Sequence, residues 1–252
     1  MLAESVFDLD LLGRWDEALA RVEEAEQVTS TSYDQIGELV AISVHCARGE
    51  PEKARTQLMR LAAVGQSDDP QAIAAYAAFE ARLLRVEGRL VEALTAAERA
   101  LAERQEVGLT WAMKVAVGEA LEASFALGDQ RIREHLAALD ATQPGGLTPL
   151  LRAQQARFRA RLAGTHDPQA ETDFAAAEDI FRRLETPFHL AVTLIEHAEL
   201  LRDRDRPDDA EPLLAEAREI FERLHAKPWL DRAVQATQAE RQPEVAVQMV
   251  DR

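Results

Sequence analysis

A break in the hydrophobic pattern returns every 36 to 41 residues along this chain, and this period constrains the fold more than any other feature. On both sides of each break, apolar residues have the spacing of an amphipathic helix. The breaks are short polar turns, and we number each by its turn residue: Gly13, Gly49, Gly88, Gly128, Gly164 and Asp205. The period therefore matches one helix hairpin with its connections.

A small residue follows most of these turns at a fixed distance. The fifth position after the turn residue is alanine at 18, 54, 93 and 210, and the alanine at 170 comes one position later. Only Arg133 departs from this pattern. Since a small side chain lets two helices approach closely, the pattern predicts tightly packed hairpins.

The predicted fold class is all-α, a solenoid of about six helix hairpins followed by a closing helix. Low aromatic content (5%) and few glycines and prolines favour helices over strands. Stacked hairpins bury their apolar faces on their neighbours, so we expect a single domain over residues 1–241 and a flexible tail over 242–252. The expected units are 1–28, 33–64, 69–105, 109–142, 147–185 and 187–225, with the closing helix at 229–241.

Two phrases that span a turn, GRWDEALARVEEA (13–25) and GRLVEALTAAERA (88–100), resemble the tetratricopeptide repeat. Residues 190–233 are similar to the end of the tetratricopeptide region in large bacterial, especially actinobacterial, signalling proteins. Those proteins place an adenylate/guanylate cyclase domain or a LuxR-type DNA-binding domain on a P-loop ATPase that precedes the repeats. The resemblance implies a divergent repeat module with a sensory or scaffolding role.

Charge and cysteine content exclude several classes of function. The net charge of -16 disfavours binding to nucleic acid, because the phosphate backbone would be repelled. The single cysteine, Cys46, lies in an apolar helical run and has no second thiol for a disulfide. The sequence shows neither a signal peptide nor an uncharged apolar run of membrane-spanning length, so we expect a cytoplasmic chain with no membrane partner.

No catalytic motif is found in the sequence. The three lysines do not follow a glycine, which excludes a P-loop. No two of the six histidines have the four-residue spacing of a helical metal site, so no metal and no cofactor are predicted. Acidic pairs occupy first turns or exposed helix faces, where solvation accounts for them. We therefore predict that the chain is not an enzyme, and an unrecognised helical active site is the least favoured reading.

The concave face of the solenoid is the predicted binding surface. If the register is that of tetratricopeptide repeats, positions three and six before each turn residue point into the groove. Besides Phe7, Asp10 and Cys46, these two columns contain the candidate site residues: Ser43, Arg82, Arg85, Glu122, Phe125, Phe158, Arg161, Glu199 and Arg202. Arginine suits carboxylates, so one hypothesis is a groove for an acidic or C-terminal peptide segment. The alternative is that these arginines pair with glutamates of neighbouring helices and bind nothing.

The leading functional prediction is a non-catalytic protein-protein interaction or scaffolding module, either the regulatory region of a bacterial signalling protein or a stand-alone relative. The alternative is a peptide or small-molecule sensor in which ligand binding changes solenoid curvature and so regulates a partner. A homodimer is compatible with exposed solenoid ends.

A duplicated run near the end of the chain marks the junction between units. Residues 177–184 match 217–224 at an offset of 40, and Pro187-Phe188 matches Pro228-Trp229 at an offset of 41. A proline at this position starts the next helix, and the following aromatic residue is expected to pack back on the completed hairpin. We interpret both runs as architecture rather than as a site.

Overall fold

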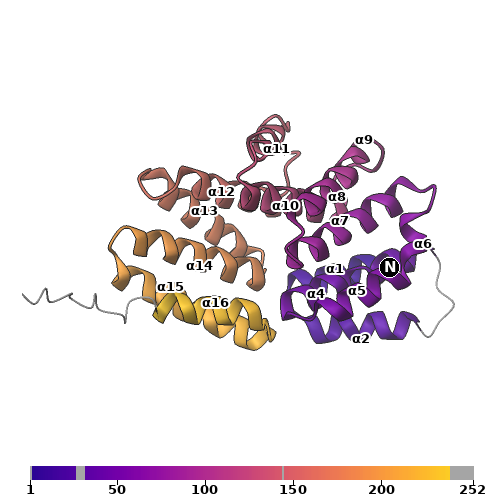
Figure 1. Ribbon diagram of the computed structural model, residues 1–252, viewed down its shortest axis with the longest axis horizontal. Helices are drawn as coiled ribbons and strands as arrows, with labels where there is room; N and C mark the ends of the chain where they lie inside the picture. Colours follow the sequence, from indigo (N-terminus) through magenta and orange to yellow (C-terminus); the bar gives the residue numbers. More distant parts are fainter. Residues whose placement is uncertain (1, 27–31, 144, 239–252) are drawn as a thin grey trace, which may run out of the picture.

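A computed structural model of the protein describes residues 2–26, 32–143 and 145–238, and within these ranges it contains helices and no strand (Figure 1). Consecutive helices pack in adjacent pairs, and each pair packs on the next. The predicted all-α solenoid is therefore confirmed.

The short helices Ala62–Gly65 and Arg104–Val107 cross the predicted ends of the second and third units, at 64 and 105. The first three hairpins contain α1 (Leu2–Leu11), α2 (Trp15–Glu26), α3 (Ser32–Glu38), α4 (Val40–Arg48), α5 (Pro51–Arg60), α6 (Ala62–Gly65), α7 (Pro70–Val86), α8 (Leu90–Ala102) and α9 (Arg104–Val107). The remaining helices are α10 (Trp111–Leu127), α11 (Arg131–Asp140), α12 (Pro149–Ala163), α13 (Gln169–Arg183), α14 (Pro187–Asp203), α15 (Pro207–Leu224) and the closing helix α16 (Lys227–Gln238). The predicted last residues of the closing helix (239–241), the tail 242–252 and the end of the first unit (27–28) lie outside the described residues.

Local sequence signals fix where these helices start and stop. Thr110 and Thr148 precede α10 and α12, and each side-chain hydroxyl accepts a hydrogen bond from a backbone N–H of the first turn. These caps satisfy donors that a helix N-terminus leaves open. Gly49 ends α4 in the left-handed conformation, with φ of 77°, which glycine adopts without steric cost.

The predicted small residues lie between the paired helices. The five alanines at 18, 54, 93, 170 and 210 are each at most 1% exposed. The exception is α11, where Arg133 is exposed and the buried positions are Ile132, Leu136 and Leu139. Figure 1 shows α11 standing above the junction of α10 and α12.

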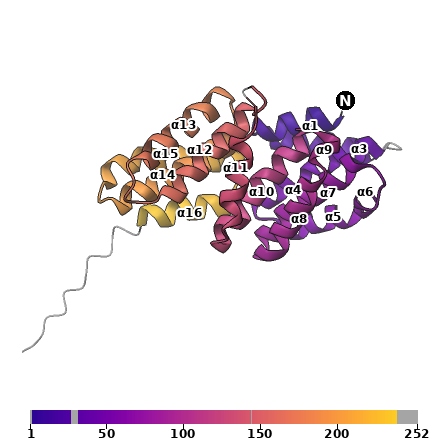
Figure 2. The ribbon, with the colours of Figure 1, turned by 90° about the horizontal axis from the view of Figure 1, so that it is seen from above.

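The two ends of the solenoid meet. In Figures 1 and 2 the N-terminal helices form one flank and the C-terminal helices the other, with α10 between them, and α16 packs on α4 across the gap. The rings of Trp15 and Phe188 lie 5.4 Å apart, and Arg48 Nε donates to the carbonyl of Leu224 at 3.3 Å. We call this contact zone the seam, and its residues are Gly13, Trp15, Arg48, Gly49, Pro187, Phe188, Leu224 and Pro228.

The duplicated run of the sequence supplies the C-terminal side of the seam. Trp229 stacks on Phe221 of α15, as predicted for an aromatic residue that packs on the completed hairpin. Phe188 contacts Phe221 and Trp229, and its contact with Trp15 crosses the seam. The apolar core of the last two hairpins and the closing helix therefore includes residues of α2 and α4.

None of the helices in the described part of the chain combines the length and the apolar character needed to cross a bilayer.

Candidate functional site

The first helices of the hairpins surround a small cavity on the concave side, between the two flanks. Its volume is about 70 Å³. A water molecule takes up about 30 Å³, and pockets for small molecules start at about 300 Å³, so the cavity holds a few waters or one small polar group. Four predicted site residues line it together with Cys46: Ser43, Arg82, Arg85 and Glu122.

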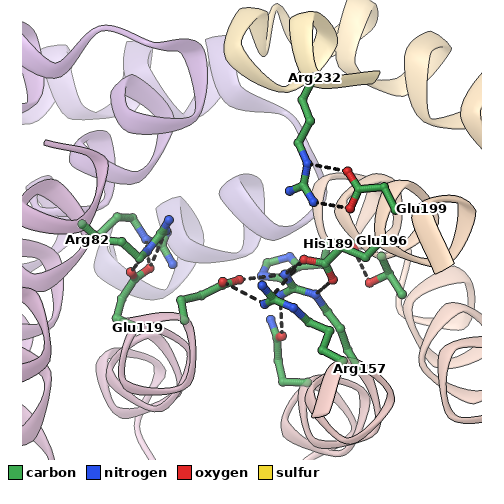
Figure 3. A network of polar contacts seen from close by, with 12 residues as sticks. Arg82, Glu119, Arg157, His189, Glu196, Glu199 and Arg232 are labelled. Atoms are coloured by element: carbon green, nitrogen blue, oxygen red, sulfur yellow. Dashed lines mark hydrogen bonds and ion pairs between the residues drawn. The ribbon is translucent and has the colours of Figure 1, made fainter. Parts of the chain in front are cut away.

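Charged side chains of alternating sign connect the first helices across this cavity (Figure 3). Arg82 of α7 donates from Nε to Glu119 of α10 at 2.7 Å, and Arg85 donates from Nε to the other oxygen of the same carboxylate at 2.6 Å. Arg82 also donates to the hydroxyl of Ser43 on α4 at 2.5 Å. One carboxylate therefore serves two guanidinium groups at this end of the cavity.

A second group of ion pairs lies between α10, α12 and α14. Arg157 of α12 donates from Nε and Nη2 to the two oxygens of Glu196 on α14, both at 2.6 Å, and pairs with Glu122 of α10 at 2.8 Å. Figure 3 shows Arg157 pointing toward Glu196, and the arginine side chain is only 4% exposed. A bidentate pair of this kind is among the stronger polar contacts in proteins.

Three further predicted residues form a cluster next to this second group. Arg161 lies over the ring of Phe125 at 3.8 Å and over Phe158 at 4.8 Å, measured from the guanidinium carbon to the ring centre. The same guanidinium group pairs with Glu122 at 3.1 Å and with Glu196 at 3.5 Å. The cation is thus held by two rings and two carboxylates.

The last two predicted residues lie away from the cavity lining. Glu199 of α14 accepts hydrogen bonds at 2.9 and 2.6 Å from Arg232, which reaches down from the closing helix α16 (Figure 3). Arg202 lies in the last turn of α14 and is half-buried. The structure therefore brings together Ser43, Arg82, Arg85 and Glu122, places Phe125, Phe158 and Arg161 beside them, and leaves Glu199 and Arg202 further along the groove.

Several residues of the site escaped the sequence reasoning, among them Glu119, Arg157, His189 and Glu196. Glu119 and Glu196 lie three residues before Glu122 and Glu199, so a third column, nine residues before each turn residue, would have found them. Each of α10 and α14 thus presents two glutamates one helical step apart, one to each neighbouring helix.

The burial of these groups shifts their proton affinities. Burial alone would raise the pKa of Glu119, but the charges and hydrogen bonds of Arg85 and Arg82 outweigh it and hold that pKa below its usual value. Burial raises the pKa of Asp10, which lines a neighbouring cavity, to about 6, although Arg82 acts against it. Burial also raises the pKa of the Cys46 thiol to about 12, so this cysteine is not a nucleophile.

His189 of α14 also lines the cavity, and its buried Nδ1 has no hydrogen-bond partner among the described residues. Burial lowers the pKa of this imidazole to about 3, with a smaller contribution from the charges of Arg82 and Arg157. The ring is therefore neutral at physiological pH.

Both interpretations of the groove arginines have support in this geometry. The arginines pair with glutamates of neighbouring helices, as the second interpretation states. At Arg82 and Arg85, however, two guanidinium groups share one glutamate, and their side chains remain 20% and 22% exposed. The binding of an acidic segment at this end of the groove stays a prediction.

Within residues 2–26, 32–143 and 145–238, no three histidine, cysteine or acidic side chains are placed to hold a metal ion.

No family model matches the chain, and no curated protein matches it. Among solved structures, the chain is similar to the crystal structure of BtubC (BKLC) from P. vanneervenii. The two sequences are 15% identical, the match covers 96% of this chain and 98% of that chain, and the TM-score is 0.41. This likeness is distant.

Proposed function

We propose that the chain is a non-catalytic protein-interaction module that receives a carboxylate of a partner, from an acidic side chain or a chain end, at Arg82 and Arg85. The observation that carries this proposal is the sharing of Glu119 by two guanidinium groups that remain about a fifth exposed. A guanidinium group has five N–H donors in a planar fork that matches a carboxylate. Arg82 uses two of its three nitrogens, one for Glu119 and one for Ser43. Arg85 also uses two of its nitrogens, both for Glu119. N–H donors of both side chains therefore remain for a second carboxylate.

The size of the cavity limits what enters it. A cavity of about 70 Å³ accepts one carboxylate group and not a peptide backbone. The rest of the partner would therefore lie outside the cavity, beside the exposed Val86. Recognition of this kind selects for a negative charge at one position of the partner.

Fluorescence anisotropy with labelled hexapeptides tests the proposal. We expect a peptide that ends in two glutamates with a free carboxylate to bind, and an amidated peptide with glutamine in their place to bind at least about tenfold more weakly. Higher salt should weaken the binding, because part of the attraction is between exposed charges.

The double variant Arg82→Gln/Arg85→Gln should lose the binding, while Arg99→Gln should keep it. Arg99 pairs with Glu80 and does not line the cavity, so it is a control for the loss of a positive charge elsewhere on the protein. Thermal unfolding of all variants separates lost binding from lost folding. Unchanged binding by a folded double variant, or no binding by any acidic peptide at millimolar concentration, would refute the proposal.

One observation favours a sensor as the second candidate function. The cavity is lined from both sides of the seam, by Ser43 and Cys46 of α4 and by His189 and Trp229 of α14 and α16. A ligand that contacts both sides would bind the closed and open solenoid with different affinity and so shift their populations. Small-angle X-ray scattering with and without the bound glutamate peptide tests this candidate, since a sensor requires a change in the radius of gyration.

A further inference from the structure

The cavity that contains Arg82 and Arg85 has two walls of different character. The charged wall lies on α7, α10 and α12 and includes Arg82, Arg85, Glu119, Glu122 and Arg157. Next to the seam, α14 and α16 line the cavity with three apolar residues, which we call the apolar wall: Phe188, Val192 and Trp229. An occupant that fits both walls has a charged group with hydrocarbon beside it.

The apolar wall is fixed by its own packing. The ring centres of Phe188 and Trp229 lie 5.5 Å apart with the planes at 89°, and both rings contact Phe221 of α15. Val192 follows Phe188 by one helical turn and is 4% exposed. The side chains of this wall contain no good hydrogen-bond acceptor. A peptide N–H placed against them would therefore lose its bond to water without a replacement.

The charges around the cavity favour an occupant with a single negative charge. The ion pairs there join four arginines to three glutamates: Arg82, Arg85, Arg157 and Arg161, with Glu119, Glu122 and Glu196. Asp10 and Lys114 of the neighbouring cavity have opposite charges and leave this excess of one positive charge unchanged. Burial lowers the pKa of His189 to about 3, so its imidazole adds no charge. One carboxylate therefore balances the cavity, whereas a phosphate dianion would exceed the balance.

The two kinds of carboxylate in a protein differ in the groups attached to them. A chain-end carboxylate is joined to a carbon that also bears a peptide N–H, whereas the carboxylate of a glutamate is joined to two methylene groups. The volume of about 70 Å³ is little more than that of two waters at about 30 Å³ each, so the cavity has room for a carboxylate and one neighbouring group. A methylene group fits there better than an N–H, because the apolar wall cannot replace the hydrogen bond of the N–H.

We propose that the residue of the partner that enters the cavity is a glutamate, with its side-chain carboxylate at Arg82 and Arg85 and its methylene groups against the apolar wall. This inference rests on the proposed function and selects the acidic side chain over the chain end. Aspartate has one methylene group fewer, and burial of one such group changes an affinity about fourfold. The expected order of affinity is therefore glutamate, then aspartate, then the chain end.

Fluorescence anisotropy with four labelled glycine pentapeptides that differ in the central residue and in the C-terminal end tests this order. Three peptides have blocked ends and contain glutamate, aspartate or glutamine, and the fourth contains glutamine and ends in a free carboxylate. We expect the glutamate peptide to bind about fourfold more tightly than the aspartate peptide and at least about tenfold more tightly than the free-end peptide. If the free-end peptide binds as tightly as the glutamate peptide or more tightly, the inference is overturned and the proposed function stands. No binding of any of the four at millimolar concentration would refute both.

Two valines give matched variants for the apolar wall. Val192 and Val117 of α10 are 4% and 5% exposed, but Val117 does not line the cavity. Val192→Thr keeps the shape of the side chain and adds a hydroxyl group to the wall, so it should weaken the binding of the glutamate peptide at least about threefold. Val117→Thr should leave this binding unchanged, and thermal unfolding checks that both variants are folded. If folded Val192→Thr binds the glutamate peptide as tightly as the wild type does, the methylene groups do not lie on this wall and the inference fails.

Discussion

At the scale of single residues, the packing of the first helices involves buried charged side chains that are paired with one another. Arg157 is surrounded by Glu122, Gln154 and Glu196, and its burial costs desolvation that only good geometry offsets. Such a network contributes little net stability compared with an apolar core, but the loss of one member removes hydrogen bonds from the groups that stay buried. It therefore favours one arrangement of the helices over others.

Replacement of Arg157 by alanine should lower the free energy of unfolding by about 3 to 5 kcal/mol, because the buried Glu196 and the half-buried Glu122 keep only Arg161 as a partner. Urea denaturation measures this loss. The control is Arg99→Ala, where the pair with Glu80 is half-exposed and the expected loss is below about 1 kcal/mol. Similar losses in the two variants would show that the buried network is no more critical than a surface pair.

His189 should make the protein less stable in mild acid. Its pKa is about 3 in the folded protein and about 6.5 in the unfolded chain, so the unfolded chain binds more protons at pH values between these. Stability from the neutral ring is therefore complete above pH 6.5 and is lost as the pH falls. Between pH 7 and pH 5 the wild type should lose about 2 kcal/mol more than His189→Phe, measured by urea denaturation at both pH values.

The comparison with His189→Phe isolates the histidine from the other acid-sensitive groups. Glu119 has a pKa below its usual value, so its contribution to stability is also lost as the pH falls, but at lower pH than that of His189. Identical pH profiles for the wild type and the variant would mean that the imidazole has the same pKa in the folded and in the unfolded protein.

At the scale of elements, α11 differs from the other second helices. Its buried residues are Ile132, Leu136 and Leu139, and an open space lies on each side of it. By contrast, α13 buries alanines and phenylalanines against both neighbours. Segments with few buried contacts open at lower free energy than the rest of a protein.

Hydrogen exchange should therefore show α11 as the least protected of the long second helices. We expect amides of Arg131–Asp140 to exchange at least about tenfold faster than those of Gln169–Arg183 in the native protein. Mass spectrometry of labelled peptides measures both segments in one experiment. Equal protection would mean that α11 opens only together with the whole fold.

The elements were largely predictable from sequence because helix periodicity and turn residues act locally. The sequence also showed that α11 departs from the pattern, because Arg133 stands where the other second helices have a small residue. It did not show which residue is buried there: in the structure Arg133 is exposed and the neighbouring Ile132 is buried. The candidate site was only partly predictable. The repeat register predicted that Arg82 and Arg85 face the groove. Their pairing with Glu119 depends on the rotation of α10 relative to α7, which no local sequence pattern encodes.

At the scale of the whole molecule, the seam turns an open solenoid into a closed one. It joins parts of the chain that are far apart in sequence, such as Arg48 and Leu224, which are separated by 176 positions. Sequence reasoning did not predict it, because contacts at this separation follow from the accumulated curvature of all the hairpins. Closure also explains why the concave groove is a small cavity rather than an open channel.

A comparison of two glycines distinguishes the effect of the seam from the effect of the turn conformation. Gly49 and Gly88 have nearly equal φ angles, 77° and 78°, but a Cβ on Gly49 would lie 2.6 Å from Pro228, whereas a Cβ on Gly88 would meet nothing within 4 Å. Gly88→Ala should therefore cost only the backbone strain, about 1 to 2 kcal/mol. Gly49→Ala should cost more and should push α16 away from α4.

Urea denaturation and small-angle X-ray scattering of the two variants check this prediction. We expect a larger radius of gyration for Gly49→Ala and no change for Gly88→Ala. If both variants lose the same stability and keep the wild-type scattering profile, the seam does not hold the ends of the solenoid together in solution.

The pairing at the seam also limits how this protein can vary in length. Gly13 meets Pro187 and Gly49 meets Pro228, so two successive turns at one end match two successive bends at the other. Open repeat proteins gain or lose whole units easily and need polar caps at both ends. Here the end units cover each other, and the insertion or deletion of a single hairpin would move one partner of both pairs. The two pairs at the seam therefore fix the number of hairpins that lie between their partners.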